Sequence, residues 1–139
     1  MATLESIEGI GAANAKKLRA AGVKSTDSLL KTGGTKKGRK DLAASSGIGE
    51  RSILEWVNRA DLMRVKGVST QYSDLLEASG VDTVKELAKR RPDNLTVKMK
   101  QVNDAAVAKG SSIVRRPPSQ KEVEKWVAQA KKMKPAVSY

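Results

Sequence analysis

The apolar residues of the chain recur at the spacing of amphipathic helices. One apolar stripe with separations of three and four residues consists of Ile53, Trp56, Val57, Ala60 and Met63. The same stripe returns later in the chain at Val123, Trp126, Val127, Ala130 and Met133. Stretches rich in Ala, Leu, Lys and Glu favour helix throughout, and no segment has the strict alternation of a strand. The sequence therefore predicts an all-α protein whose two tryptophans belong to the core.

Several local signals predict where individual helices begin and end. Capping boxes are predicted at Ser119 with Glu122 and at Thr83 with Glu86. Pro92 suits the first turn of a helix. The buried face of that helix is predicted to contain Leu95, Met99, Val102 and Ala106. Gly22 and Gly80 have the position of residues that end helices in the left-handed conformation.

The chain contains an internal repeat with two registers. Residues 7–30 align without gaps on residues 65–88 at an offset of 58, and residues 51–63 align on residues 121–133 at an offset of 70. The difference between these offsets means that 12 residues are inserted before the last helix of the second copy. The matched pairs include Gly9 with Gly67, Gly22 with Gly80, and Trp56 with Trp126. This similarity is difficult to attribute to chance resemblance between helices.

The repeat predicts the domain organisation. Unit one is expected to span residues 1–61 and unit two residues 62–134, with a disordered tail at residues 135–139. No Gly/Ser-rich linker separates the two units. Each unit is therefore interpreted as one duplicated helical module, with the inserted residues forming an extra helical segment in unit two.

The amino-acid composition indicates which binding partners and which kinds of reactive site are possible. Lys and Arg number 27 and Asp and Glu 15, a formal charge of +12, which attracts nucleic acid, acidic proteins or anionic membranes. Cys and His are absent, so disulfides, thiol chemistry and the commonest general base are excluded, and no metal or cofactor is expected. The first residues do not resemble a signal peptide, and no apolar run approaches the roughly 20 residues of a membrane helix. We expect a cytoplasmic protein without a membrane partner, nucleoid-associated if it binds DNA.

The segment Ile7–Leu18 carries the clearest motif. A Gly-apolar-Gly turn at Gly9 and Gly11 is followed by an Ala and a Leu at helical spacing, and this order resembles the helix-hairpin-helix motif. Such glycines permit positive φ and leave backbone N–H groups uncovered at the start of a helix. The helix dipole adds partial positive charge there, so the turn is suited to one phosphate. Lys16 and Lys17 follow one turn later, where at least one should face the same anion.

A second Gly-apolar-Gly turn lies at Gly47 and Gly49, with Arg51 at the start of the following helix. Two such turns joined by a short helix, near Thr26–Leu30, resemble the paired helix-hairpin-helix domain found in the C-terminal domain of the bacterial RNA polymerase α subunit. The whole chain is similar to a bacterial helix-hairpin-helix family without assigned function. The resemblance implies contacts between these glycine turns and phosphates on both strands across a minor groove.

Unit two departs from this pattern. Its first turn keeps Gly67, with Lys66 beside it, but has Ser69 in place of the second glycine. Its last turn is replaced by Pro117 and Pro118, and proline has no N–H to donate. Neighbouring Arg115 and Arg116 could make charge contacts instead. Unit two is therefore interpreted as a weakened or repurposed copy.

Unit one also contains a basic segment between its two turns. Residues 31–40 hold five basic residues and no acidic ones among glycines, and are expected to form a flexible loop that reaches a phosphate. The alternative is an ordinary solvated loop. The complete set of candidate nucleic-acid contacts is Gly9, Gly11, Lys16, Lys17, Lys36, Lys37, Arg39, Gly47, Gly49, Arg51, Lys66, Gly67 and Ser69.

These features favour binding of duplex DNA backbone without sequence specificity, because no cluster of Arg, Asn or Gln on a groove-entering helix is evident. RNA is an alternative partner. The competing hypothesis is a protein–protein scaffold whose basic surface docks an acidic partner, since helix-hairpin-helix elements also serve docking. Enzymatic activity is not expected, because the chain lacks the second lobe that forms the base pocket of helix-hairpin-helix glycosylases. The sequence leaves the oligomeric state open.

Overall fold

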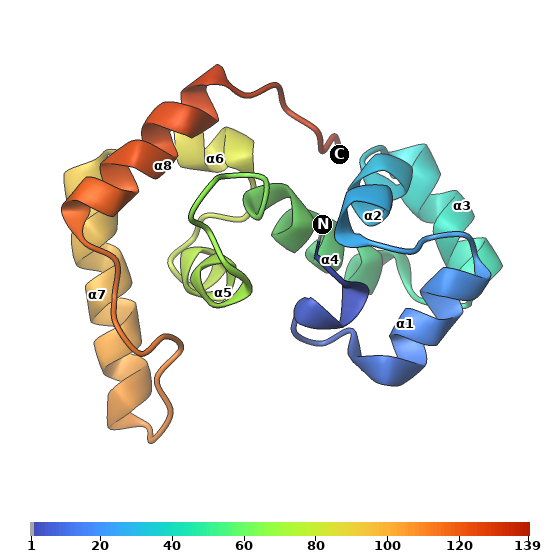
Figure 1. The fold of residues 1–139 in the computed structure, drawn as a ribbon, viewed down its shortest axis with the longest axis horizontal. Coiled ribbons are helices and arrows are strands. Elements are labelled where there is room, and N and C mark those ends of the chain that lie inside the picture. The colour runs from blue at the N-terminus through green and yellow to red at the C-terminus, as the bar shows by residue number, and fades with distance from the viewer. Residues whose placement is uncertain (1) are drawn as a thin grey trace. The chain divides into compact units, whose positions relative to one another are not determined.

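The structure is a computed structural model that describes residues 2–139, and every regular element in this range is helical (Figure 1). A single 3-10 turn, η1, spans Leu4–Ser6. The α-helices are α1 (Gly11–Ala20), α2 (Thr26–Gly33), α3 (Lys36–Ser46), α4 (Glu50–Leu62), α5 (Thr70–Ala78), α6 (Val84–Ala88), α7 (Pro92–Ala108) and α8 (Gln120–Lys132). The prediction of an all-α protein is confirmed.

The chain forms two compact units. One comprises the residues up to Asp61 together with Pro135–Tyr139, and the other comprises Leu62–Lys134. Unit one therefore contains η1 and α1 to α4, and unit two contains α5 to α8, with α4 ending at the first residue of unit two. Segments matched by the sequence repeat form elements in the same order in both units. Helices α4 and α8 each contain 13 residues and begin 70 positions apart.

Helices α1 and α5 end in the same way. Gly22 and Gly80 follow these helices with φ of 93°, a left-handed conformation that favours glycine. The next residue in each case closes the helix, since Val23 N–H donates to Leu18 O at 2.9 Å and Val81 N–H donates to Leu76 O at 2.8 Å. The predicted roles of both glycines as helix terminators are confirmed.

The tryptophan of each last helix packs beneath the glycine turn of its own unit. In unit one, Trp56 is 6% exposed, and a Cβ at Gly9 would lie 3.5 Å from its Nε1. In unit two, Trp126 is 3% exposed, and a Cβ at Gly67 would lie 3.0 Å from its Nε1. Both glycines have φ near 93°. The two apolar stripes are thus core faces, as predicted.

The core of unit two surrounds α8, which packs on α6 and α7. Pro92 occupies the first turn of α7, and Leu95 and Met99 are buried as predicted. The other two residues of the predicted face, Val102 and Ala106, are only partly buried. The polar side chain of Asn103 is buried beside them instead. The Asn103 Oδ1 accepts the N–H groups of Ile113 and Val114, at 2.9 and 3.0 Å. This side chain holds the returning loop of the insertion against α7.

The predicted capping boxes differ in completeness. At α8, Glu122 N–H donates to Ser119 Oγ and Ser119 N–H donates to Glu122 Oε1, both at 3.2 Å, so this box is confirmed. At α6, Thr83 Oγ1 accepts the N–H of Glu86, but the reciprocal bond is not formed, since the Glu86 carboxylate accepts from Arg90 instead. The second box is therefore half formed.

The expectation of a disordered tail is wrong. Ser138 N–H donates to Gly34 O at 2.8 Å, and the Arg39 guanidinium donates to Ser138 O at 2.6 Å. The C-terminal segment accordingly ends beside α2 within unit one (Figure 1). Its order comes from the Gly34 carbonyl and the Arg39 side chain, about a hundred residues away in sequence, which local composition does not reveal.

We predict that Trp56→Ala and Trp126→Ala each lower the free energy of unfolding by about 3–5 kcal/mol, because each removes a buried ring and leaves a cavity under a glycine turn. Chemical denaturation followed by circular dichroism measures this change. Val97→Ala, at a position that is 56% exposed, is the control and should change stability by less than about 0.5 kcal/mol. Small losses in both tryptophan variants would contradict the packing described here.

Candidate nucleic-acid interface

The first glycine turn, residues 9–11, leads into the open N-terminus of α1. Gly9 and Gly11 have φ of 93° and 66°, so both occupy the left-handed region as predicted. No side chain caps the helix, whose N-cap position is the buried Ile10. A Cβ at Gly11 would meet nothing within 4 Å. The first N–H groups of α1 therefore lack a capping side chain, and nothing crowds the backbone at Gly11.

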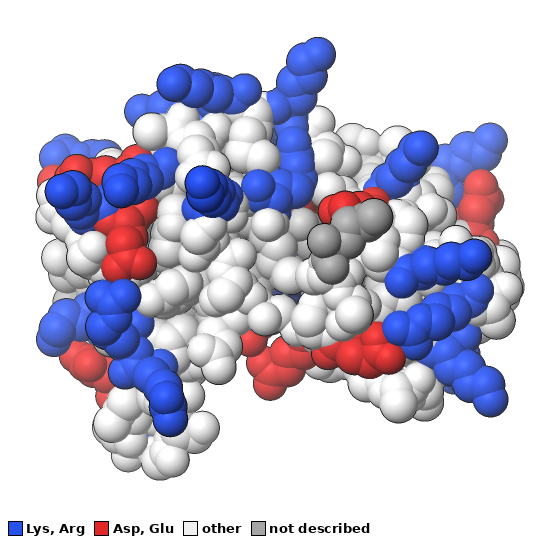
Figure 2. All heavy atoms as spheres, in the orientation of Figure 1, with Lys and Arg blue, Asp and Glu red and all other residues white. Residues whose placement is uncertain are grey.

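Charged side chains lie beside this turn and along α1. Lys16 and Lys17 are exposed on α1, as the predicted role requires. Arg19 is paired with Glu5 at 2.6 Å, and this hydrogen bond lowers the pKa of Glu5, so the Arg19 charge is largely offset at neutral pH. Glu8 is also exposed beside the turn. Figure 2 shows Lys and Arg gathered over α1, at the right of the view, with acidic side chains beside them.

The second glycine turn, residues 47–49, joins α3 to α4 and requires one correction. Gly47 has a φ of 75°, but its N–H donates to Ala43 O at 3.0 Å and so ends α3. The amide of Gly47 is consequently not available to a phosphate, contrary to the prediction. Gly49 has open space above it, and Arg51 is exposed on the first turn of α4. Glu50 is exposed between them and opposes an anion.

The third turn, residues 67–69, makes more hydrogen bonds within the protein than the first turn does. The N–H of neighbouring Lys66 donates to Gln129 Oε1 at 3.0 Å, and Gln129 Nε2 donates back to Lys66 O at 3.2 Å. Ser69 Oγ accepts the N–H of Tyr72 and caps α5. Lys66 and Gly67 border a shallow pocket of about 300 Å³ whose other walls come from α8. The Ser69 hydroxyl, which was expected to meet phosphate, is therefore engaged within unit two, whereas Lys66 and Gly67 are exposed.

The double proline of unit two leads directly into α8. Ser119 after the prolines is the N-cap of α8. Arg116 contacts the Glu122 carboxylate at 3.4 Å, and its carbonyl accepts the hydroxyl of Tyr72 at 3.2 Å. Arg115 is exposed. This segment offers a side-chain charge but no glycine turn.

The basic segment of unit one is helical, not a flexible loop. Thr35 caps α3 by accepting the N–H of Gly38 at 3.0 Å, and glycine does not prevent the helix from forming there. Lys36 and Lys37 are exposed in its first turn. Lys36 lines a pocket of about 380 Å³ together with Arg51, so the fold brings these two predicted residues together.

Arg39 is a correction to the predicted site. Its side chain is buried, with 4% exposure, and donates to Gly33 O at 2.9 Å and Gly34 O at 3.2 Å, besides Ser138 O. The guanidinium also lies 5.9 Å from the centre of the Tyr139 ring. A cation is retained in this buried position because three backbone carbonyls receive its N–H groups. Arg39 thus joins the α2–α3 turn to the C-terminal segment; it also lines the pocket beside Lys36 and Arg51, but its guanidinium is engaged by protein carbonyls.

The family assignment follows from comparison with known proteins. The sequence profile of the family described as a domain of unknown function (DUF4332) matches residues 8–133, nearly the whole chain. The chain belongs to this family. No curated protein and no solved structure gives a significant match. Family membership therefore covers both units without assigning an activity to either.

Within residues 2–139, no group of three or more acidic, His or Cys side chains is arranged to hold a metal ion. None of the helices in the same range combines the length and apolar character that crossing a bilayer demands.

We predict that Arg39→Gln lowers the free energy of unfolding of unit one by about 2 kcal/mol or more, because it leaves buried carbonyls without donors. Lys37→Gln, the matched removal of one positive charge from the same helix, should leave stability unchanged within about 0.5 kcal/mol. Denaturant titrations of both variants measure the difference. Equal stability of the two variants would show that Arg39 has no structural role.

Proposed function

We propose that the protein binds the backbone of duplex DNA without reading its sequence, through helix-hairpin-helix turns in unit one. The observation that carries this proposal is the uncapped start of α1 at Gly11, with Lys16 and Lys17 exposed on the same helix. An unpaired set of N–H groups at a helix N-terminus attracts an anion through both hydrogen bonds and the helix dipole. A glycine at this point lets a phosphate oxygen approach the backbone.

Open space over a glycine does not by itself indicate a phosphate site. Gly22 and Gly110 also have nothing within 4 Å of a Cβ position, but both follow the C-terminal ends of helices. Carbonyl groups and the negative end of the dipole face outward there and disfavour anions. Gly11 differs from these two glycines because it begins a helix. The position of Gly11 at the start of a helix, and not the open space around it, supports its assignment as a phosphate contact.

Unit one is proposed as the main contact, although unit two carries more charge. Residues 62–139 contain 16 basic and 8 acidic residues, against 11 and 7 in residues 1–61. Aligned N–H donors fix a phosphate in place, whereas dispersed lysines only attract it. The third turn has its neighbouring amide paired with Gln129 and its serine used as a cap, which favours the first turn as the phosphate contact.

We predict that affinity for duplexes of unrelated sequence is similar and falls steeply with salt. The log–log slope should be about −0.9 for each neutralised phosphate. Fluorescence anisotropy with two labelled duplexes, at two or more salt concentrations, measures both properties. Failure to bind duplex at low salt, or binding that is insensitive to salt, would overturn the proposal; tight capture of one acidic protein with weak duplex binding would favour the docking alternative.

We predict that Gly11→Ala weakens DNA binding more than Gly22→Ala. Both glycines have positive φ and free space for a Cβ, so the two substitutions cost similar backbone strain, about 1 kcal/mol each. They lie at opposite ends of α1, and only Gly11 borders the proposed phosphate. Circular dichroism establishes that both variants fold, and anisotropy compares their affinities. Equal affinities would remove the first turn from the interface.

The two units are compared in a parallel pair of variants. Gly49→Ala adds a methyl group at a position without positive φ or close neighbours, and Ser69→Ala removes the hydroxyl of the third turn. The larger loss of affinity is expected for Gly49→Ala. If folded Ser69→Ala loses more affinity than both Gly49→Ala and Gly11→Ala, unit two is the binding face.

A further inference from the structure

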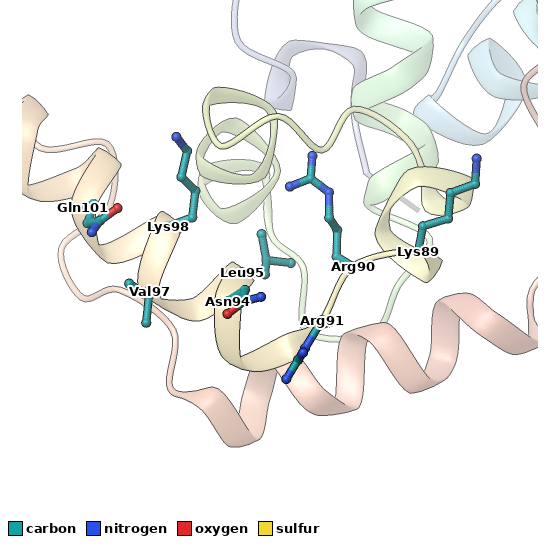
Figure 3. A pocket seen from close by; sticks show the side chains of 8 residues that line it. All are labelled: Lys89, Arg90, Arg91, Asn94, Leu95, Val97, Lys98 and Gln101. Carbon is teal, nitrogen blue, oxygen red and sulfur yellow. The ribbon is translucent and has the colours of Figure 1, made fainter.

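A separate basic pocket lies in unit two, where α6 gives way to α7. It has a volume of about 540 Å³ and is lined by Lys89, Arg90, Arg91, Asn94, Leu95, Val97, Lys98 and Gln101 (Figure 3). Four of these side chains are cationic, two are amides, and none is acidic. The pocket does not include any glycine turn. It therefore constitutes an anion-attracting surface independent of the helix-hairpin-helix resemblance.

The charge of this pocket is only partly neutralised by neighbouring groups. Arg91 contacts the Asp93 carboxylate at 3.0 Å, and Figure 3 shows its side chain pointing away from those of Lys89, Arg90 and Lys98. Neither Lys89 nor Lys98 has an ion-pair partner within the part of the chain that the structure describes. These two lysines therefore give the pocket a net positive charge.

Arg90 is held in place by protein contacts. Its Nε donates to the Glu86 carboxylate at 3.3 Å, and its Nη2 donates to Gly80 O at 2.9 Å. A guanidinium has five N–H donors, so three remain available for an acceptor in the pocket. Because its position is already fixed, an anion that binds there does not have to order a flexible side chain.

The N-terminus of α7 contributes little to this anion preference. Its first residue, Pro92, has no N–H. The next residue, Asp93, accepts the N–H of Asn94 at 2.8 Å, and this bond, together with Arg91, lowers the pKa of the Asp93 carboxyl. Asp93 is therefore ionised at neutral pH and offsets the helix dipole. The side chains, and not the helix end, select the ligand.

We propose that this pocket binds phosphate esters, with Lys89, Arg90 and Lys98 contacting the phosphate oxygens. Asn94 and Gln101 supply neutral donors and acceptors that suit the sugar attached to a phosphate. The volume lies in the range of pockets that hold a ligand larger than a single phosphate ion. Such esters occur in a nucleic acid strand and in free nucleotides. Assignment to a strand rests on the proposed DNA-binding function, whereas assignment to a free nucleotide does not.

The test compares two double variants of the full chain that lose the same charge from unit two. Lys89→Gln with Lys98→Gln removes the unpaired lysines of the pocket. Lys121→Gln with Lys131→Gln removes two exposed lysines of α8 that line no described pocket. Thermal unfolding establishes that both variants are folded. One arm titrates a labelled mixed-sequence duplex at several salt concentrations, and the other titrates adenosine triphosphate while the amide resonances of Asn94 and Gln101 are followed by NMR.

If the phosphates belong to DNA, the pocket variant should have a salt slope reduced by about 1.8, for two lost phosphate contacts, and the control variant a slope close to that of the parent. If they belong to a free nucleotide, adenosine triphosphate should shift the Asn94 and Gln101 resonances in the parent and the control but not in the pocket variant. Equal behaviour of both double variants in both arms would overturn the inference.

The outcomes also separate this inference from the proposed function. A pocket variant that binds duplex like its control, while Gly11→Ala binds weakly, leaves the function standing and excludes a DNA contact at the pocket. A parent protein that does not bind duplex but binds adenosine triphosphate at the pocket refutes the function and supports the pocket as a nucleotide site.

Discussion

The contact between a glycine turn and the tryptophan of the last helix is the constraint on which each unit depends. At Gly67 a Cβ would lie only 3.0 Å from the Trp126 indole nitrogen, and the positive φ excludes most other residues as well. The contact joins the first turn of a unit to its last helix. It thereby positions the helix that follows the turn, which is α1 in unit one and α5 in unit two. In unit one the same arrangement of Gly9 and Trp56 places the open end of α1 on the surface. A packing requirement and an anion-attracting feature therefore arise from one turn.

Much of the fold could be predicted because its determinants are local. The spacing of apolar residues indicated the helices, and the glycines after α1 and α5 indicated their ends. Features that depend on distant partners could not be predicted. Arg39 belongs to a run of basic residues and has the sequence context of a solvated side chain, yet it is buried against carbonyls that only the folded α2–α3 turn brings together. Asn103 interrupts an apolar stripe, but nothing in the stripe indicates that its side chain holds a loop ten residues later.

The candidate site, like the fold, could be predicted only where it depends on local sequence. The Gly-apolar-Gly spacing located both turns of unit one, but it could not reveal that the amide of Gly47 completes the preceding helix. The basic pocket of unit two was missed as a site, although one signal was present in the sequence. Asn94, Lys98 and Gln101 are separated by four and three residues and therefore share a helix face. Only the fold shows that this face adjoins Lys89 and Arg90.

The docking of the C-terminal segment makes unit one discontinuous in sequence, with the whole of unit two inserted before its last residues. During synthesis on the ribosome, residues 135–139 emerge after both units have otherwise been made. Until then Arg39 lacks the carbonyl of Ser138, and the backbone at Gly34 lacks its partner. Completion of unit one is thus coupled to the synthesis of residues 135–139, and a ribosome-bound chain ending at Asp61 would carry an α2–α3 turn without these partners.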